Sequence, residues 1–187
     1  MDLTPTASQT VGPYLHLGLT DAGSISRVAG DGATGERLWL TFRVRDGEGV
    51  PVPDAMIELW QADSEGNYEL PAGSADGAAF HGFGRMATAR DGSCTFETIR
   101  PGRVQGPDDT RQAPHINVSI LGRGLLKRLS TRLYFAGEPA NAADPVLALV
   151  PESRRATLLA QPDPARSNGW TFEVRLRGEG ETVFFDV

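Results

Sequence analysis

His115 lies in a segment, Ala113 to Ile120, whose residue types could place one imidazole at a metal site. In a β-strand, residues two apart point to the same face of the sheet, so His115 and Asn117 are expected on one face. Two histidines with this spacing would give two nitrogen ligands for iron, copper or zinc. Asn117 offers only a neutral carboxamide. The segment therefore predicts a metal-binding framework that lacks one ligand.

Two other segments carry residues suited to a site. Gly12 permits a close backbone approach, Pro13 fixes the local chain, and Tyr14 adds an aromatic face with a hydroxyl. Tyr68 follows a strand-like run and a turn at 63–66, where its phenol would be accessible. Taken alone, each segment is also explained as an ordinary turn.

The elements that would position these groups are mainly β-strands. Apolar residues alternate with polar ones from Leu38 to Arg45, which is the period of a half-buried strand. One helix is expected from Pro151 to Ala160, after a short turn near Pro145 to Leu149. Further strands are expected at 55–60, 93–99, 115–121, 130–135, 170–177 and 182–185.

These elements predict a mainly β fold with a two-layer β-sandwich core, long loops, an N-terminal arm and one or two short helices. Residues 1–35 are interpreted as the arm, which needs another surface to order it, and residues 36–187 as the sandwich domain. Residues 70–84, rich in glycine and alanine, are expected to form a long irregular loop.

Composition narrows the range of functions. The 187 residues suffice for one domain with a substantial core. The formal net charge of −6 argues against a nucleic-acid partner, which calls for clustered positive charge. The single cysteine, Cys94, is interpreted as a small core residue, and the N-terminus lacks a signal-peptide pattern. We therefore expect a cytoplasmic protein with no membrane partner.

Several motifs in the same order make the chain resemble the intradiol ring-cleavage dioxygenases. They are Ser-Gln-Thr-Val-Gly-Pro-Tyr at 8–14, Glu-Leu-Trp-Gln-Ala-Asp at 58–63, Pro-His-Ile-Asn at 114–117, Thr-Arg-Leu-Tyr-Phe at 131–135 and Gly-Glu-Gly-Glu-Thr-Val-Phe-Phe-Asp at 178–186. The resemblance covers nearly the whole chain. It implies a β-sandwich core and a non-haem ferric ion held by two tyrosines and two histidines in the catalytic subunit.

The resemblance also implies that this chain has lost its own iron site. Tyr68 and His115 match one tyrosine and one histidine ligand, whereas Val104 and Asn117 stand at the other two positions. Valine has no donor atom, and asparagine is a weak neutral ligand for hard, oxidised iron. We therefore expect no bound metal and no catalytic residue in this chain alone. Fe(3+) would be held by a paralogous partner subunit in a larger hetero-oligomer.

In the family, the non-iron subunit supplies part of the wall of its partner's pocket. The resemblance assigns this substrate-binding role to Thr10, Gly12, Pro13, Tyr14 and Arg123. The guanidinium of Arg123 would bind the carboxylate of a dihydroxybenzoate. The hydroxyls of that substrate would then chelate the partner's iron during O2-dependent ring cleavage.

Three alternatives remain open. A single-chain enzyme could use a rearranged metal site with replacement ligands among His16 and His81, or the chain could be a non-enzymatic β-sandwich binding module. Arg132 could take the role given to Arg123. His115 could simply be a core histidine satisfied by the backbone or by Tyr68.

Overall fold

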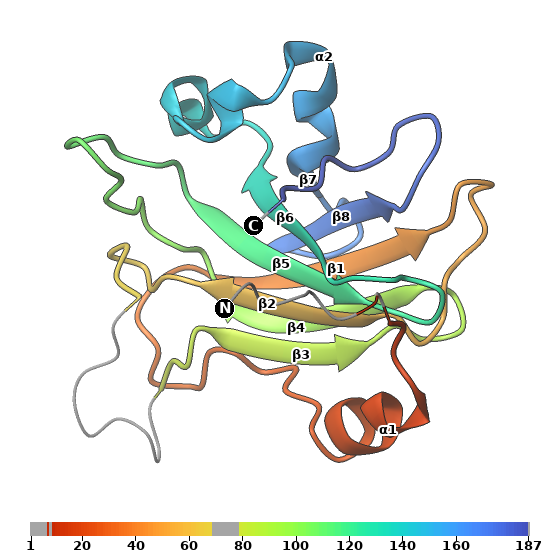
Figure 1. Cartoon of the computed structure of the whole chain (residues 1–187). Helices are drawn as coiled ribbons and strands as arrows, with labels where there is room; N and C mark the ends of the chain where they lie inside the picture. Colours follow the sequence, from red (N-terminus) through yellow and green to blue (C-terminus); the bar gives the residue numbers. More distant parts are fainter. Residues whose placement is uncertain (1–6, 8, 69–78, 187) are drawn as a thin grey trace, which may run out of the picture.

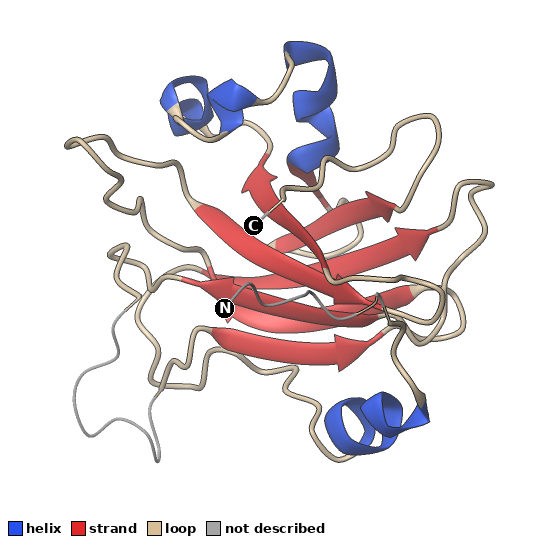
Figure 2. Ribbon diagram, in the orientation of Figure 1, coloured by secondary structure: helices blue, strands red, loops and turns tan. Residues whose placement is uncertain are grey.

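Eight strands form one mixed sheet in the computed structural model, which describes residues 7, 9–68 and 79–186 (Figure 1; Figure 2). The order is β3-β2-β5-β6-β7-β8-β1-β4, and neighbours are antiparallel except for the pairs β1–β8 and β6–β7. The sheet folds over on itself, and its two halves enclose the core, as the predicted sandwich requires. The strands are β1 Arg37–Arg45, β2 Met56–Gln61, β3 Phe83–Ala87, β4 Ser93–Ile99, β5 His115–Leu121, β6 Leu129–Phe135, β7 Leu159–Pro162 and β8 Gly169–Arg175.

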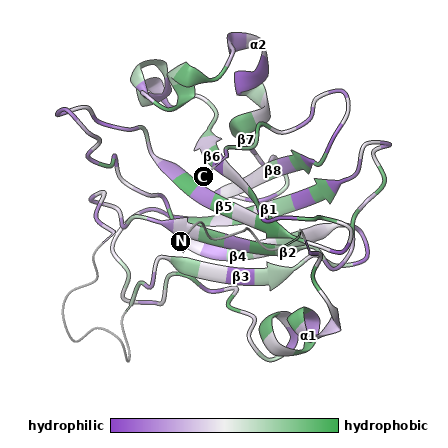
Figure 3. Ribbon diagram, viewed as in Figure 1, coloured by the Kyte–Doolittle hydropathy of each residue, from purple (hydrophilic) through white to green (hydrophobic). Residues whose placement is uncertain are grey.

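The core is built from the inward-facing residues of the strands, which alternate with outward-facing ones along each strand. Phe42 in β1 is fully buried, and its ring makes edge contacts with Phe96 at 5.6 Å and Phe172 at 5.8 Å between centroids. Burying a side chain of this size contributes roughly 1.5–3 kcal/mol. Hydrophilic residues occur in the loops at both ends of the sheet, and also on α2 and on parts of the strands (Figure 3).

The buried carboxylate of Asp144 connects three segments. Its Oδ2 accepts a hydrogen bond from the backbone N–H of Ala113 at 2.7 Å, and its Oδ1 accepts one from the hydroxyl of Tyr134 at 3.0 Å. The backbone N–H groups of Val146 and Leu147 also donate to Oδ1. Asp144 thus fixes the chain entering β5, the end of β6 and a following helical turn.

Part of the N-terminal segment, residues 25–28, packs against the sheet of the same chain. Ile25 and Arg85 exchange two backbone hydrogen bonds of 2.7 and 3.0 Å, and Val28 is fully buried in the core. A Cβ on Gly84 would lie 2.8 Å from Val28 and 2.9 Å from the ring of Phe96, so only glycine fits beneath this segment. The division at residue 35 and the predicted subunit contact of the arm stay predictions.

Helical turns are short. The arm carries α1 Pro13–Leu15 and the π-helical η1 His16–Asp21, with α1 at the lower right in Figure 1. Within 151–160, α2 Glu152–Arg155 and the 3₁₀ turn η4 Ala156–Leu158 occur, and β7 begins at Leu159, so the predicted helix is shorter than expected. No helix in the described ranges is long and apolar enough to cross a membrane. The other 3₁₀ turns are η2 Pro139–Ala143 and η3 Leu147–Leu149.

Most predicted strands are confirmed, and three predictions differ from the structure. The strand expected at 182–185 is wrong, because this segment forms no continuous ladder with the sheet: it makes a bridge between Phe185 and Ser130 and a backbone hydrogen bond from Thr182 to Arg175. β3 and β7 were not expected, since Gly84 and Pro162 interrupt their patterns. The loop expected at 70–84 ends before β3, and its residues 70–78 lie outside the described residues.

Asp144→Ala should lower the free energy of unfolding by about 3 kcal/mol or more, because each buried polar group left unsatisfied costs roughly 1–3 kcal/mol. Urea denaturation followed by circular dichroism measures this loss. Asp91 accepts hydrogen bonds in an exposed turn, and Asp91→Ala is the matched control with a much smaller expected loss. Equal losses in the two variants would contradict the role given to Asp144.

Candidate functional site

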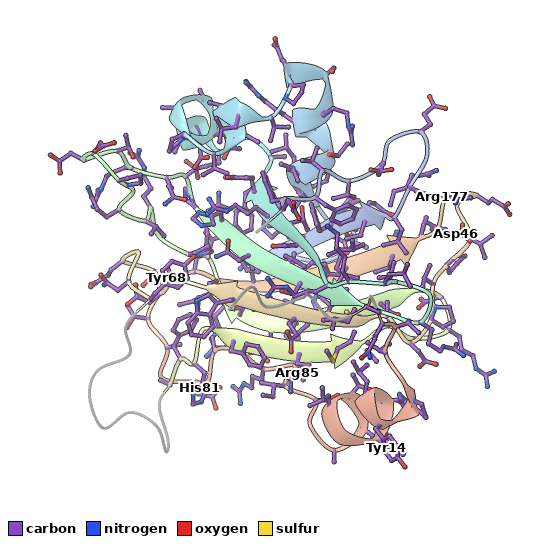
Figure 4. The ribbon with its side chains drawn as sticks, viewed as in Figure 1. Tyr14, Asp46, Tyr68, His81, Arg85 and Arg177 are labelled. Carbon is purple, nitrogen blue, oxygen red and sulfur yellow. The ribbon has the colours of Figure 1, made fainter. Side chains whose placement is uncertain are left out.

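A phenol, an imidazole and an amide meet at one end of the sheet. Asn117 in β5 pairs with Trp60 in β2, and the ring of Tyr68 stacks on Trp60 with 6.0 Å between centroids. His115 lies two residues before Asn117 on the same face, as predicted. Figure 4 shows Tyr68 at the left end of the sheet. The structure thus brings together three of the four predicted ligand positions.

The turn at 63–66 positions Tyr68 beside His115 and Asn117. The carboxylate of Asp63 accepts a backbone hydrogen bond from Asn67 at 2.9 Å. Gly66 has a φ of +93°, and a Cβ there would lie 2.1 Å from the carbonyl oxygen of Arg103. Glycine is therefore required, both for the left-handed conformation and for the close approach of the neighbouring loop.

Hydrogen bonds hold this group in a neutral arrangement. The Nδ1 of His115 lies 2.8 Å from the carbonyl oxygen of Ala113. Because a carbonyl only accepts, Nδ1 donates and Nε2 is left as an acceptor. The hydroxyl of Tyr68 lies 3.4 Å from this Nε2, and the amide nitrogen of Asn117 donates to the Tyr68 oxygen at 2.9 Å. The phenol therefore donates to the imidazole and accepts from the amide.

Burial keeps both groups uncharged. It raises the pKa of Tyr68, although the charge of Arg132 and the hydrogen bond from Asn117 oppose this shift. It lowers the pKa of His115, although the hydrogen bond to Ala113 opposes it. The guanidinium of Arg132 donates to Gln112 at 2.6 Å, so this residue is tied to the Tyr68 end of the sheet.

This donor set does not fit a ferric ion. Hard, oxidised iron favours anionic oxygen ligands, and among the four predicted positions only Tyr68 could supply one. Asn117 turns its amide nitrogen, which has no free electron pair for a metal, toward that phenol. Val104 is buried and has no donor in its side chain. In the parts of the chain that the structure describes, no three His, Cys, Asp or Glu residues are placed to share a metal.

A second polar group lies at the other end of β5. The backbone N–H of Gly124 donates to the hydroxyl of Thr10 at 3.0 Å, which joins the arm to the loop after β5. Arg123 in that loop is 77% exposed, and its Nη2 lies 3.9 Å from Oδ2 of Asp54. Tyr14 is 82% exposed. The predicted substrate-binding residues Thr10 and Arg123 are thus close together, and Gly12 and Pro13 continue from them as exposed backbone.

The two groups are far apart. Six residue steps separate His115 from Leu121 along β5, which is about 20 Å of extended chain. In Figure 4, Tyr68 lies at the left end of the sheet, whereas Tyr14 lies at the lower right, on the helix below the sheet. A small molecule bound at Arg123 could not reach Tyr68 and His115 of the same chain.

The remaining candidate ligands and nucleophile, His16, His81 and Cys94, lie in separate parts of the structure. His16 faces Asp54 near Arg123, whereas His81 precedes the end of β3 that pairs with Trp60, so the two histidines cannot share one metal site. Burial raises the pKa of Cys94 to about 12, and this thiol is a core residue as predicted. Sequence reasoning missed Asp54, because nothing local relates it to Arg123.

Comparison with known proteins identifies the family. A family profile described as "Dioxygenase" matches residues 11–178. The chain belongs to the intradiol dioxygenase family. The dioxygenase domain of a dioxygenase and carbohydrate-binding protein fusion from Streptomyces sp. SirexAA-E superimposes with a TM-score of 0.65 and 27% identity, covering 94% of this chain and 99% of that one.

Within the intradiol dioxygenases, curated relatives are similar over different lengths. The protocatechuate 3,4-dioxygenase alpha chain of Burkholderia cepacia is 44% identical, covering 99% of this chain and 98% of that protein. The alpha chain of Pseudomonas putida is 43% identical, covering 98% and 97%. The beta chain of Burkholderia cepacia is 34% identical, covering 79% and 67%.

The lowered pKa of His115 makes stability depend on pH. In the unfolded chain this histidine titrates near 6.5, so the unfolded state binds more protons as the pH falls below that value. Its contribution is present above pH of about 6.5 and is lost as the pH falls through the native pKa. His115→Asn, which keeps a donor toward Ala113, should flatten the decline of the urea midpoint between pH 7.5 and 5. His81→Asn, at an exposed position, should leave the slope unchanged.

Proposed function

We propose that this chain is the alpha, non-iron-binding subunit of a protocatechuate 3,4-dioxygenase. The complex with its beta subunit would insert both atoms of O2 into 3,4-dihydroxybenzoate and yield 3-carboxy-cis,cis-muconate, a step in the breakdown of aromatic compounds. Fe(3+) bound by the beta subunit would supply the activation of the catecholate. This chain would shape the substrate pocket and be inactive alone.

The main support for this proposal is the nearly full-length similarity to two protocatechuate 3,4-dioxygenase alpha chains. Both relatives are 43–44% identical to the chain and match it from end to end, whereas the beta chain is 34% identical and matches 79% of it. The beta chain's similarity indicates that the two subunits of such an enzyme are related to each other. A partner of the same family is therefore the expected source of the iron site.

The distance between the two polar groups supports the same division of labour. His115 and Leu121 at the two ends of β5 lie about 20 Å apart, and Arg123 follows Leu121 by two residues, so the two groups are separated by far more than the span of one benzoate ring. A substrate held by Arg123 therefore needs its metal from another chain. The exposure of Arg123 and Tyr14 leaves both side chains available to a neighbouring subunit.

Arg123 would act by orienting the substrate. A guanidinium binds a carboxylate with two parallel hydrogen bonds, and this fixes the plane of the ring. Thr10, Gly12, Pro13 and Tyr14 would complete the wall beside it. Correct placement of reacting groups lowers the barrier by several kcal/mol without any chemistry from this chain.

The same proposal includes the assembly and location of the protein. Alpha–beta pairs would join into a larger oligomer, with the arm of residues 1–35 at the contact between subunits. A buried, reduced Cys94 suits a cytoplasmic location, where thiols stay reduced.

Arg123→Ala in the alpha–beta complex should raise KM for 3,4-dihydroxybenzoate roughly 10- to 100-fold, because a hydrogen bond to a charged group contributes about 1.5–3 kcal/mol. Steady-state oxygen uptake measures the change, and iron content should not alter. Arg111→Ala, at an exposed arginine near the other end of β5, is the control and should behave as wild type. An unchanged KM in Arg123→Ala would remove Arg123 from the substrate site.

The purified chain alone should contain no stoichiometric iron and no colour from tyrosinate-to-iron charge transfer, because its donor set does not fit the ion. Metal analysis and visible absorption spectroscopy test this after incubation with ferrous iron and air. Co-expression with a beta subunit should give a coloured, active complex. Stoichiometric iron in the chain alone would support a single-chain enzyme instead.

A further inference from the structure

Asp54 occupies a special position beside Arg123. It lies in the turn before β2 with a φ of 59°, and its backbone N–H donates to the carbonyl of Thr88 at 3.0 Å. Its carboxylate is half exposed and stands between an imidazole and a guanidinium from two other segments. Oδ1 lies 3.9 Å from Nδ1 of His16, and Oδ2 lies 3.9 Å from Nη2 of Arg123.

We propose that Asp54 is a specificity-determining residue, the anion that a substrate carboxylate must displace from Arg123. This inference rests on the proposed function, in which Arg123 binds that carboxylate. By competing for Arg123, Asp54 would lower the affinity for ligands that carry a carboxylate. The affinity for ligands without a carboxylate would not depend on Asp54.

The geometry of the pair fits a displaceable partner. At 3.9 Å, Asp54 and Arg123 are too far apart for a hydrogen bond, and both side chains are more than half exposed. Exposed ion pairs of this kind are weak. Arg85 and Glu58 show the contrast, since they lie 2.6 Å apart with side chains only 22% exposed. Arg123 can therefore leave Asp54 at small cost.

Backbone hydrogen bonds hold the turn of Asp54, whereas the side chain of Arg123 is exposed. The next residue, Ala55, donates its N–H to the hydroxyl of Thr88 at 2.9 Å, which fixes the turn. On the other side, nothing lies within 4 Å of a Cβ position on Gly124, and the side chain of Arg123 is 77% exposed, so this side chain has space in which to reorient.

Asp54→Asn in the alpha–beta complex tests the proposal. Asparagine has nearly the same shape and accepts a left-handed conformation, so the turn should persist. The KM for 3,4-dihydroxybenzoate should fall about two- to five-fold at low ionic strength, as expected for loss of one exposed ion pair. The kcat and the inhibition constant of catechol, which lacks a carboxylate, should not change.

Combining the change with Arg123→Ala isolates the pair, because Asp54→Asn should then have no effect on KM. Glu173→Gln removes an exposed carboxylate that faces Arg43 and Arg45 on another part of the sheet, and it should leave KM unchanged. Asp54→Gly, which suits the same φ, should reproduce Asp54→Asn if the turn is intact.

Two results would overturn the proposal. One is a KM that stays equal or rises in Asp54→Asn, and the other is a fall that persists without Arg123 or extends to catechol. If Arg123→Ala itself leaves KM unchanged, the assigned role of Arg123 fails instead. The failure of this inference and that of the proposed function are thus distinguishable.

Discussion

The buried carboxylate of Asp144 is the interaction on which the arrangement around β5 depends. It accepts hydrogen bonds from the segment entering β5, from Tyr134 at the end of β6 and from the turn that follows Asp144 itself. A buried carboxylate is stable only when its oxygens are satisfied, so these three segments must keep their relative positions. Ala113, held by this carboxylate, in turn fixes the ring of His115 through its carbonyl oxygen.

β5 therefore separates two kinds of polar environment. At its start, burial and mutual hydrogen bonds keep Tyr68 and His115 neutral. Beyond its end, Arg123 is charged and exposed to solvent. The two ends of one strand thus differ in burial and charge, and the proposed function assigns the substrate-binding role to the exposed end. The backbone of β5 can stay the same while the side chains at its start and in the loop after its end differ.

Local patterns in the sequence predicted most of the fold, and long-range contacts explain what they missed. The alternation at 37–45 and 115–121 marks strands because one face of each is buried. β3 was missed because Gly84 breaks its pattern, and the reason for that glycine lies in Val28 and Phe96, far away in the sequence. Motif order predicted the family and brought together Tyr68, His115 and Asn117, which are neighbours in the structure. It gave no sign of Asp54, whose partner lies 69 residues later, or of Asp144 as the residue that connects strands.

The packing of Val28 against β3 also divides the N-terminal arm into two parts. Residues 25–29 form its root, which is attached to the domain, and the part around Tyr14 forms its tip, which is exposed. Ile25 and Val28 make backbone hydrogen bonds to β3 and β4, and Val28 and Ala29 are buried, so a change at these residues disturbs folding. Tyr14, farther toward the start of the arm, is 82% exposed and lies outside that core. Over evolutionary time, the tip can follow sequence changes in a partner while the root preserves the domain. Divergence between related subunits should therefore accumulate unevenly along this arm.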